Sequence, residues 1–405
     1  MRPRPRTNGS AMRTPDNDLA PPPDRYTCDG DAAVEARVAG DQALIAAAVT
    51  RVLTPPRFRA LVLMGGYGRA EGGFVMHEGQ PAPFNDYDYF IVVRGMGRAE
   101  RAALEQTLAR VSQELKGKVG VDVDFALLRD ESLATADYSL INAEMLWGHR
   151  VVAGDPQVLA AMPVMPFAGL PQAELTRLML NRGSLLLMNQ RRLEAGEAMT
   201  GQRLEIFFKF LFKAVRACGD ARLAGNRRYH PAYLTKAERL AGSDVAWPGQ
   251  AEFLGLYDQA MEAKFHPRLA RYEAEGADPR AWQGRMVQLW LDTLAWFEGV
   301  RLGRPIPDWE GYAAPTLGKG QGRDTLALPG NLARNLKTFG PLGLLRHARW
   351  ALRHPRDRLI SALPLLLANP GAAASPALAD ALGIAAGSPW VAASERFLDL
   401  WRRYS

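Results

Sequence analysis

Three short apolar runs in the first third of the chain constrain the fold more than any other feature. Residues 60–64 and 89–93 have the length and the β-branched and aromatic composition of buried strands. A third strand is predicted over 121–128, where apolar residues first alternate with two aspartates. Between the second and third runs, residues 98–116 place leucine and valine at helical spacing. This order predicts a small sheet with flanking helices.

The rest of the chain is predicted to be mainly helical. A helix is expected at 32–53, before the first strand, and long apolar-periodic helices are expected after residue 130. Those later helices are predicted at 175–193, 204–217, 251–273 and 281–302, with a further helical section from 332 to the end. The fold class is therefore α+β, with a small mixed sheet followed by a mainly α-helical C-terminal region. We expect a disordered tail at 1–25, a sheet domain at 26–160, a helical domain at 165–305, a linker at 306–330 and a basic helical segment at 331–405.

The net charge of +7 arises from two short segments. Residues 1–15 carry four arginines and no acid, which is +4, and residues 331–358 carry seven basic residues against one aspartate, which is +6. The remainder therefore has a net charge of −3, and bulk charge predicts no specific nucleic-acid partner. Two distant cysteines, no apolar run of membrane-spanning length and no secretory signal lead us to expect a cytoplasmic protein.

Paired aspartates next to the predicted strands indicate a divalent-metal site. Asp86 and Asp88 are two residues apart on a strand, so their carboxylates face the same side. Such like charges are costly unless a cation lies between them, and hard oxygen ligands favour Mg²⁺ or Mn²⁺. Asp122 or Asp124 on the third strand can supply another carboxylate. Three acids can hold two metal ions, as phosphoryl and nucleotidyl transfer require.

A phosphate site is predicted beside these acids. Gly65 and Gly66 follow the first strand and lack a Cβ, so a phosphate can approach their backbone closely. Arg69 can add a guanidinium contact to phosphate oxygens. Lys209 and Lys213 share a face of a later helix and can contact a triphosphate. The favoured alternative for these two lysines is a solvated face opposite an apolar stripe.

These motifs, in this order, resemble the polymerase-β-like nucleotidyltransferase superfamily. The segments that carry the resemblance are Leu63-Met64-Gly65-Gly66, Asn85-Asp86-Tyr87-Asp88-Tyr89 and Val123-Asp124-Phe125, within residues 55–155. The chain is most similar to the small-molecule, aminoglycoside nucleotidyltransferase-like branch, whose members carry a helical C-terminal domain. The resemblance implies a nucleotidyltransferase domain with two Mg²⁺ (or Mn²⁺) ions and an NTP such as ATP as substrate. It also implies transfer of a nucleoside monophosphate to a hydroxyl of an unknown small molecule or protein.

The resemblance further implies roles for particular residues. Gly65 and Gly66 would hold the triphosphate, and Asp86, Asp88 and Asp124 would be the metal-binding and catalytic residues. Asp124 is favoured over Asp122 because an apolar tail follows it. Nineteen residues separate Gly66 from Asp86, more than the family usually has, and the excess, residues 74–84, is expected to form a surface loop.

Two alternatives to an active enzyme stay open. One is an inactive nucleotide-binding or regulatory module with the same fold. The other is a membrane-peripheral assembly protein that contacts anionic lipid through residues 331–368, which are basic and apolar. For that segment we favour packing against the protein with its arginines outward, because its prolines interrupt any long amphipathic helix.

Overall fold

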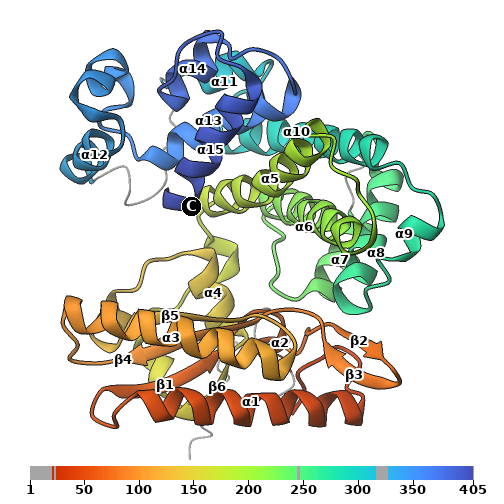
Figure 1. Cartoon of the computed structure of the whole chain (residues 1–405), viewed down its shortest axis with the longest axis vertical. Coiled ribbons are helices and arrows are strands. Elements are labelled where there is room, and N and C mark those ends of the chain that lie inside the picture. The colour runs from red at the N-terminus through yellow and green to blue at the C-terminus, as the bar shows by residue number, and fades with distance from the viewer. Residues whose placement is uncertain (1–20, 22–23, 244–246, 316–326, 405) are drawn as a thin grey trace, which may run out of the picture. The chain divides into compact units, whose positions relative to one another are not determined.

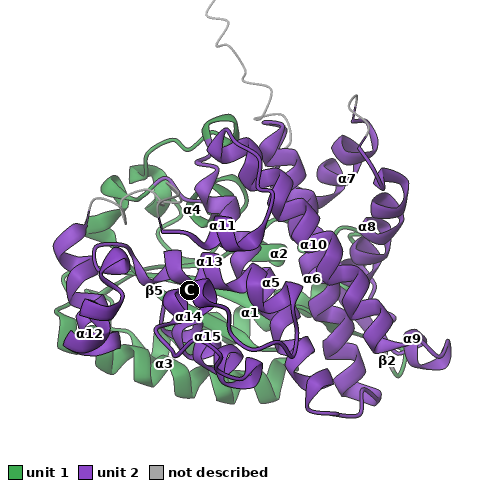
Figure 2. Cartoon of the chain, turned by 90° about the horizontal axis from the view of Figure 1, so that it is seen from above, with its two compact units in different colours: residues 1–72, 76–137, 141–169 green, residues 73–75, 138–140, 170–405 purple. Residues whose placement is uncertain are grey.

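The chain forms two compact units, each described by itself. The computed structural model describes residues 21, 24–243, 247–315 and 327–404. Unit 1 comprises residues 1–72, 76–137 and 141–169, and unit 2 comprises residues 73–75, 138–140 and 170–405 (Figure 2). Most of the predicted disordered tail, and residues 316–326 of the predicted linker, lie outside the described residues.

Unit 1 is built on a four-stranded mixed sheet (Figure 1). Its strands are β1 (Phe58–Leu63), β4 (Tyr87–Val93), β5 (Val123–Arg129) and β6 (Arg150–Gly154). The spatial order is β5-β4-β1-β6, in which β1 is antiparallel to β4 and β6 whereas β4 and β5 are parallel. Every residue of β4 except one is buried, as expected for a central strand. The predicted small mixed sheet is confirmed.

The two long helices of unit 1 form where the apolar periodicity predicts them. Helix α1 (Ala32–Val52) begins where the Asp31 carboxylate accepts hydrogen bonds from two backbone N–H groups. Helix α3 (Arg98–Val119) buries a leucine and valine stripe and ends at Gly120, whose φ of 87° is left-handed. Helix α4 covers Leu140–Trp147. Short 3₁₀ helices of unit 1 cover Asp130–Thr135, Val158–Ala161 and Phe167–Gly169, and another, Ala348–Trp350, lies in unit 2.

The expected surface loop at 74–84 is wrong in one respect. The segment contains β2 (Phe74–His77) and β3 (Gln80–Pro83), which pair as a two-stranded sheet. The strands are joined by Glu78 and Gly79, whose φ values are 51° and 77°. Two successive positive φ values are the signature of a tight hairpin turn.

From residue 170 on, the regular structure of unit 2 in its described residues is helical. The long helices α5 (Ala173–Glu194), α6 (Gly201–Gly225) and α10 (Pro279–Leu302) pack against one another around buried aromatic and leucine side chains. The remaining helices are α7 (Tyr233–Ala241), α8 (Gln250–Phe265), α9 (Arg271–Ala274), α11 (Trp309–Ala313), α12 (Leu328–Arg346), α13 (Pro355–Ala368), α14 (Pro376–Leu382) and α15 (Trp390–Tyr404). The helix predicted over 251–273 is divided between α8 and α9, because Pro267 interrupts it.

A buried ion pair lies inside unit 2. The Lys236 ammonium of α7 lies 2.7 Å from a carboxylate oxygen of Asp220 on α6, and both side chains are buried. The ammonium also lies over the rings of Tyr229 and Tyr233. A search of the described residues finds no helix long and apolar enough to cross a bilayer.

Candidate functional site

Three aspartates predicted as metal ligands meet at one edge of the unit 1 sheet. Asp88 in β4 is the direct register partner of Asp124 in β5, and Asp86 immediately precedes Tyr87, where β4 begins. Each of the three offers a carboxylate oxygen within 4.8 Å of the others. Asp86 and Asp88 are half-buried and Asp124 is exposed, so the cluster is open to solvent.

Asp122 does not join this cluster. It precedes β5, and its carboxylate lies 2.7 Å from the Lys116 ammonium at the end of α3, with 61% of its side chain exposed. The Asp122 backbone lies beside β4, since its carbonyl oxygen accepts a hydrogen bond from the Tyr87 N–H at 2.9 Å, and it is the ion pair with Lys116 that holds its carboxylate apart from the cluster. Of the two predicted candidates for the third carboxylate, the structure brings Asp124 and not Asp122 to the cluster, and metal binding by either residue stays a prediction.

The glycine turn lies directly against the acids. After β1, the Met64 N–H donates to the Asp88 carbonyl oxygen at 2.9 Å, which fixes the turn beside β4. Gly65 opens the short helix α2 (Gly65–Gly68) with a φ of 67°. A Cβ on Gly65 would lie only 2.6 Å from Oδ2 of Asp88. Glycine is therefore required here both by the backbone conformation and by the closeness of the carboxylate.

Arg69 lies in the interior of unit 1. Its side chain is 8% exposed, and its guanidinium lies 3.0 Å from Glu144 and 3.5 Å from Glu71. A buried guanidinium needs such partners, since an unpaired buried charge is strongly unfavourable. These two carboxylates are partners that the sequence did not predict, and the assignment of Arg69 to phosphate stays a prediction.

Lys209 and Lys213 lie on α6 in unit 2, whereas the aspartates and the glycine turn lie in unit 1. Both lysines are partly exposed on the helix whose other face buries phenylalanine and leucine. Their assignment to a nucleotide stays a prediction.

A layer of tyrosines supports the acids from the opposite face of β4. Tyr87 lies between the two aspartates in sequence, is buried, and donates its hydroxyl hydrogen to Asp41 of α1 at 2.9 Å. Its ring lies 4.6 Å from that of Tyr67 in α2. Burial is the largest effect on all three groups, and it raises the pKa of Tyr67, Tyr87 and Asp41. The alternation of β4 therefore separates a carboxylate face from a buried phenol face.

The buried tyrosines behind the acids were not predicted from the sequence. The one sequence signal for them is Asp41, a charged residue that falls on the buried side of the helix predicted at 32–53. A charge at such a position indicates a buried hydrogen-bond partner, but the sequence does not say which one.

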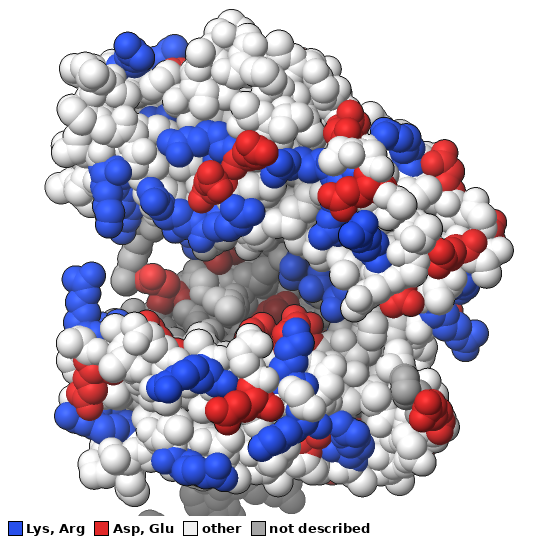
Figure 3. Space-filling model, viewed as in Figure 1, with Lys and Arg blue, Asp and Glu red and all other residues white. Residues whose placement is uncertain are grey.

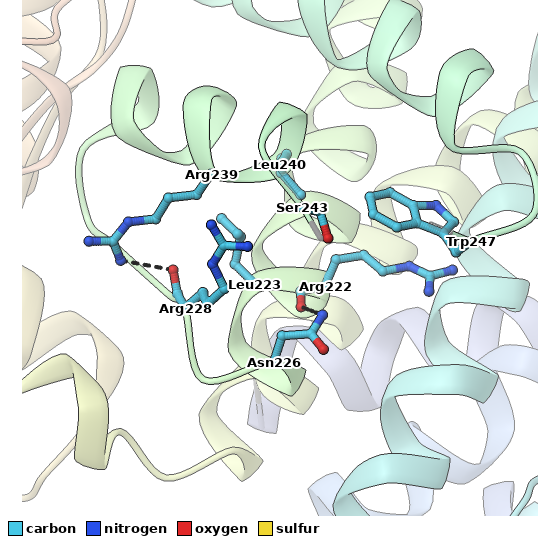
Figure 4. A pocket seen from close by; sticks show the side chains of 8 residues that line it. All are labelled: Arg222, Leu223, Asn226, Arg228, Arg239, Leu240, Ser243 and Trp247. Atoms are coloured by element: carbon cyan, nitrogen blue, oxygen red, sulfur yellow. Dashed lines mark hydrogen bonds between the residues drawn. The ribbon is translucent and has the colours of Figure 1, made fainter. Parts of the chain in front are cut away.

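A second polar feature is a pocket of about 200 Å³ within unit 2 (Figure 4). It is lined by Arg222, Leu223, Asn226, Arg228, Arg239, Leu240, Ser243 and Trp247. The Arg222 guanidinium lies over the rings of Trp247 and Trp296, and Arg239 donates to the carbonyl oxygens of Arg228 and Tyr229. These contacts join the ends of α6 and α7, so a structural role accounts for the arginines. No sequence motif singled out this pocket.

In unit 1 the aspartate cluster thus lies where the glycine turn after β1 meets the first residues of the parallel strands β4 and β5. The cluster and the glycine turn beside it contain Gly65, Gly66, Asp86, Asp88 and Asp124, the residues on which the sequence resemblance rests. Comparison of the chain with protein-family models, with curated proteins and with solved structures finds no match.

Proposed function

We propose that the protein is a Mg²⁺-dependent nucleotidyltransferase, with unit 1 as the nucleotidyltransferase domain. The observation that carries the proposal is the convergence of Asp86, Asp88 and Asp124 to within 4.8 Å beside Gly65. The substrates are an NTP and a hydroxyl of a small molecule or protein. We further propose a cytoplasmic location, where NTPs are available.

The residues present fit divalent cations. All three side chains offer carboxylate oxygens, the ligands that Mg²⁺ and Mn²⁺ favour over softer metals. Three carboxylates so close together repel one another, and cations between them relieve that repulsion. The space that a side chain on Gly65 would fill is left open next to Asp88. A bound metal pair would supply charge stabilisation for the attacking and leaving oxygens.

The roles of the chain's own residues follow from their positions. Asp86 and Asp88, on one face of β4, would hold the metal that accompanies the triphosphate. The Gly65-Gly66 turn would let the phosphates approach the backbone. Asp124 is the most exposed of the three acids, so it is the one best placed to face the acceptor. It would orient the acceptor hydroxyl and take up its proton as the oxygen attacks the α-phosphorus and pyrophosphate leaves.

The test distinguishes nucleotidyl transfer from other uses of an NTP. The protein is incubated with Mg²⁺, a cell extract and each NTP labelled at either the α- or the γ-phosphate. We expect a labelled product from one or more α-labelled NTPs, with release of pyrophosphate and no product from the γ-labelled NTP. Label transferred only from the γ-phosphate would contradict the proposal. Calorimetric NTP binding with no product would favour the inactive-module alternative.

Two matched variants then locate the chemistry. Asp124→Asn should reduce labelling by about two orders of magnitude or more while NTP affinity changes by less than about tenfold, because Asp86 and Asp88 remain. Asp122→Asn, two residues away on the same segment but outside the cluster, should keep product formation within about twofold of the original chain. Equal loss in both variants would indicate a general structural effect and would contradict the role of Asp124.

A further inference from the structure

Helix α12 has its polar side inward and its leucines outward. The residues that it buries are Asn331 and Asn335. The Asn335 amide donates to the carbonyl oxygens of Trp350 at 3.2 Å and Arg353 at 2.8 Å, and Asn331 donates to that of Leu352 at 3.2 Å. These hydrogen bonds hold the helix against residues 350–353, and the ring of Phe339 adds a contact beneath the Arg358 guanidinium. The usual arrangement of a surface helix is the reverse.

The outward leucines extend beyond α12 into a wider surface, which we call the leucine segment (residues 328–352). The helix kinks at Gly340 and Pro341, and beyond the kink Leu342 and Leu345 are 69% and 76% exposed. The exposed leucines of the segment are Leu328, Leu332, Leu336, Leu342, Leu345 and Leu352. They make up six of the thirteen large apolar side chains that are exposed among the described residues. Such a concentration marks an interaction surface, whereas single exposed leucines do not.

The same segment is basic. Residues 328–356 contain no aspartate or glutamate, and the leucine segment carries Arg334, Lys337, Arg346 and Arg349, all of them exposed. An acid that faces it from another helix is Asp380 of α14, which lies 2.7 Å from His347 and 3.6 Å from Arg349. In the view of Figure 3, the charged side chains over α12 are predominantly Lys and Arg.

From the outward leucines and the surrounding positive charge, we propose that the leucine segment docks unit 2 on an anionic lipid bilayer. Leucine side chains enter the boundary between headgroups and acyl chains, while arginine and lysine side chains reach the anionic headgroups. Each basic residue near such a surface strengthens binding, and the two effects act together. Apolar burial alone would fit a protein partner equally well, so the complementarity of charge selects the bilayer. The segment lies on the membrane rather than crossing it.

The test uses the full chain and sedimentation with sucrose-loaded vesicles. One set of vesicles is pure phosphatidylcholine, and the other also contains anionic phosphatidylglycerol, whose negative surface potential attracts basic segments. We expect binding to the anionic vesicles that is at least about tenfold stronger than to the neutral ones and that weakens as salt is raised, because screening shortens the electrostatic reach.

Two independent variants separate the apolar and the charged contributions. Leu342→Asp with Leu345→Asp should weaken binding by about tenfold or more, and Leu234→Asp, an exposed leucine of α7, is its matched control. Replacing the four exposed basic residues by glutamine should weaken binding by at least about tenfold. Its control replaces four exposed basic residues elsewhere, Arg51, Arg98, Lys118 and Arg304. Both controls should bind within about twofold of the original chain.

Three results would overturn the proposal. The first is equal binding to anionic and neutral vesicles, or none to either. The second is binding that both leucine-segment variants retain. The third is a dimer in sedimentation equilibrium that the leucine variant dissociates while vesicle binding is absent, since the surface would then join two copies of the chain. Because the substituted side chains are exposed, far-ultraviolet circular dichroism should be unchanged in every variant.

Discussion

Replacing Asp88 by asparagine should make unit 1 more stable than in the original chain when metal is absent, and less stable than in the original chain when metal is present. The side chain keeps its shape but loses its charge, so the repulsion from Asp86 and Asp124 is removed. Two unit charges 4.8 Å apart repel by about 0.9 kcal/mol at a water-like dielectric constant of about 80. Asp88 takes part in two such pairs. Part of this repulsion persists in the unfolded chain, so we expect a gain of about 1–2 kcal/mol.

Manganese should reverse the order. A ligand that binds only the folded state adds about 2.7 kcal/mol at 100 times its dissociation constant. The original chain should gain this amount, whereas the Asp88→Asn variant should gain almost nothing, because one of three charged ligands is lost. With Mn²⁺ the original chain should therefore be more stable than the variant by about 1 kcal/mol.

The assay must report on unit 1, which contains only one of the nine tryptophans, Trp147. Hydrogen–deuterium exchange of the β4 and β5 amides, in EDTA or in Mn²⁺ at low ionic strength, measures the local opening free energy there. Asp122→Asn is the control and should leave the manganese effect unchanged. In about 1 M salt, where the screening length is about 3 Å, the gain in EDTA should shrink. A variant that is less stable in EDTA, or that gains as much from Mn²⁺ as the original chain, would refute the reasoning.

Three further outcomes are expected. Gly65→Ala should lower the opening free energy of β4 by about 1–2 kcal/mol, because alanine is strained at this positive φ. It should also weaken Mn²⁺ binding measured by calorimetry, because the new Cβ would meet Asp88. The control Gly79→Ala, also at positive φ but in open space, should leave Mn²⁺ binding unchanged. The raised pKa of Asp41 means that the folded state holds this proton to higher pH than the unfolded chain, so the stability of unit 1 falls as pH rises from 3.8 through that raised pKa. Exchange measured across pH should lose this slope in Asp41→Asn. Lys236→Ala removes the ammonium that pairs with the buried Asp220 carboxylate and should destabilise unit 2 by about 3–5 kcal/mol in urea unfolding followed by tryptophan fluorescence. Partial recovery is expected when Asp220 is also replaced by asparagine.

Local patterns were sufficient to predict three of the four strands of the main sheet, but not β6, which lies where only helices were expected. The apolar runs predicted β1, β4 and β5 to within a few residues, and the spacing of Asp86 and Asp88 placed their carboxylates on one side. The same alternation could not choose between Asp122 and Asp124, since residues two apart on a strand share a face. The difference between them appears only in the folded unit, where Asp124 lies with Asp86 and Asp88 while the Asp122 carboxylate pairs with Lys116 of α3.

Long-range pairing explains the other differences. Arg69 follows the glycine turn, so a local reading assigns it to phosphate, but Glu144, 75 residues away in sequence, binds its guanidinium. The hairpin of β2 and β3 was missed because its turn is Glu78-Gly79 rather than a stronger turn dipeptide such as Asn-Gly. Residues 331–368 were expected to pack against the protein with arginines outward. Helix α13 does pack inward, but its Arg358 is buried, and α12 buries its asparagines rather than its leucines.

Tyr87 lies between two aspartates, and this alternation disfavours pairing of β4 in the wrong register. A slip of β4 by one residue would exchange its two faces, because side chains alternate along a strand. The phenol would then point to solvent, and the Asp88 carboxylate would enter the apolar space beside Asp41, where two negative charges would meet without water. A register shift that displaced the aspartates of the cluster would thus also disrupt the packing of the core. The packing of Tyr87 thus favours the one register of β4 that also aligns the carboxylates, so a correctly folded unit 1 has its acidic cluster assembled.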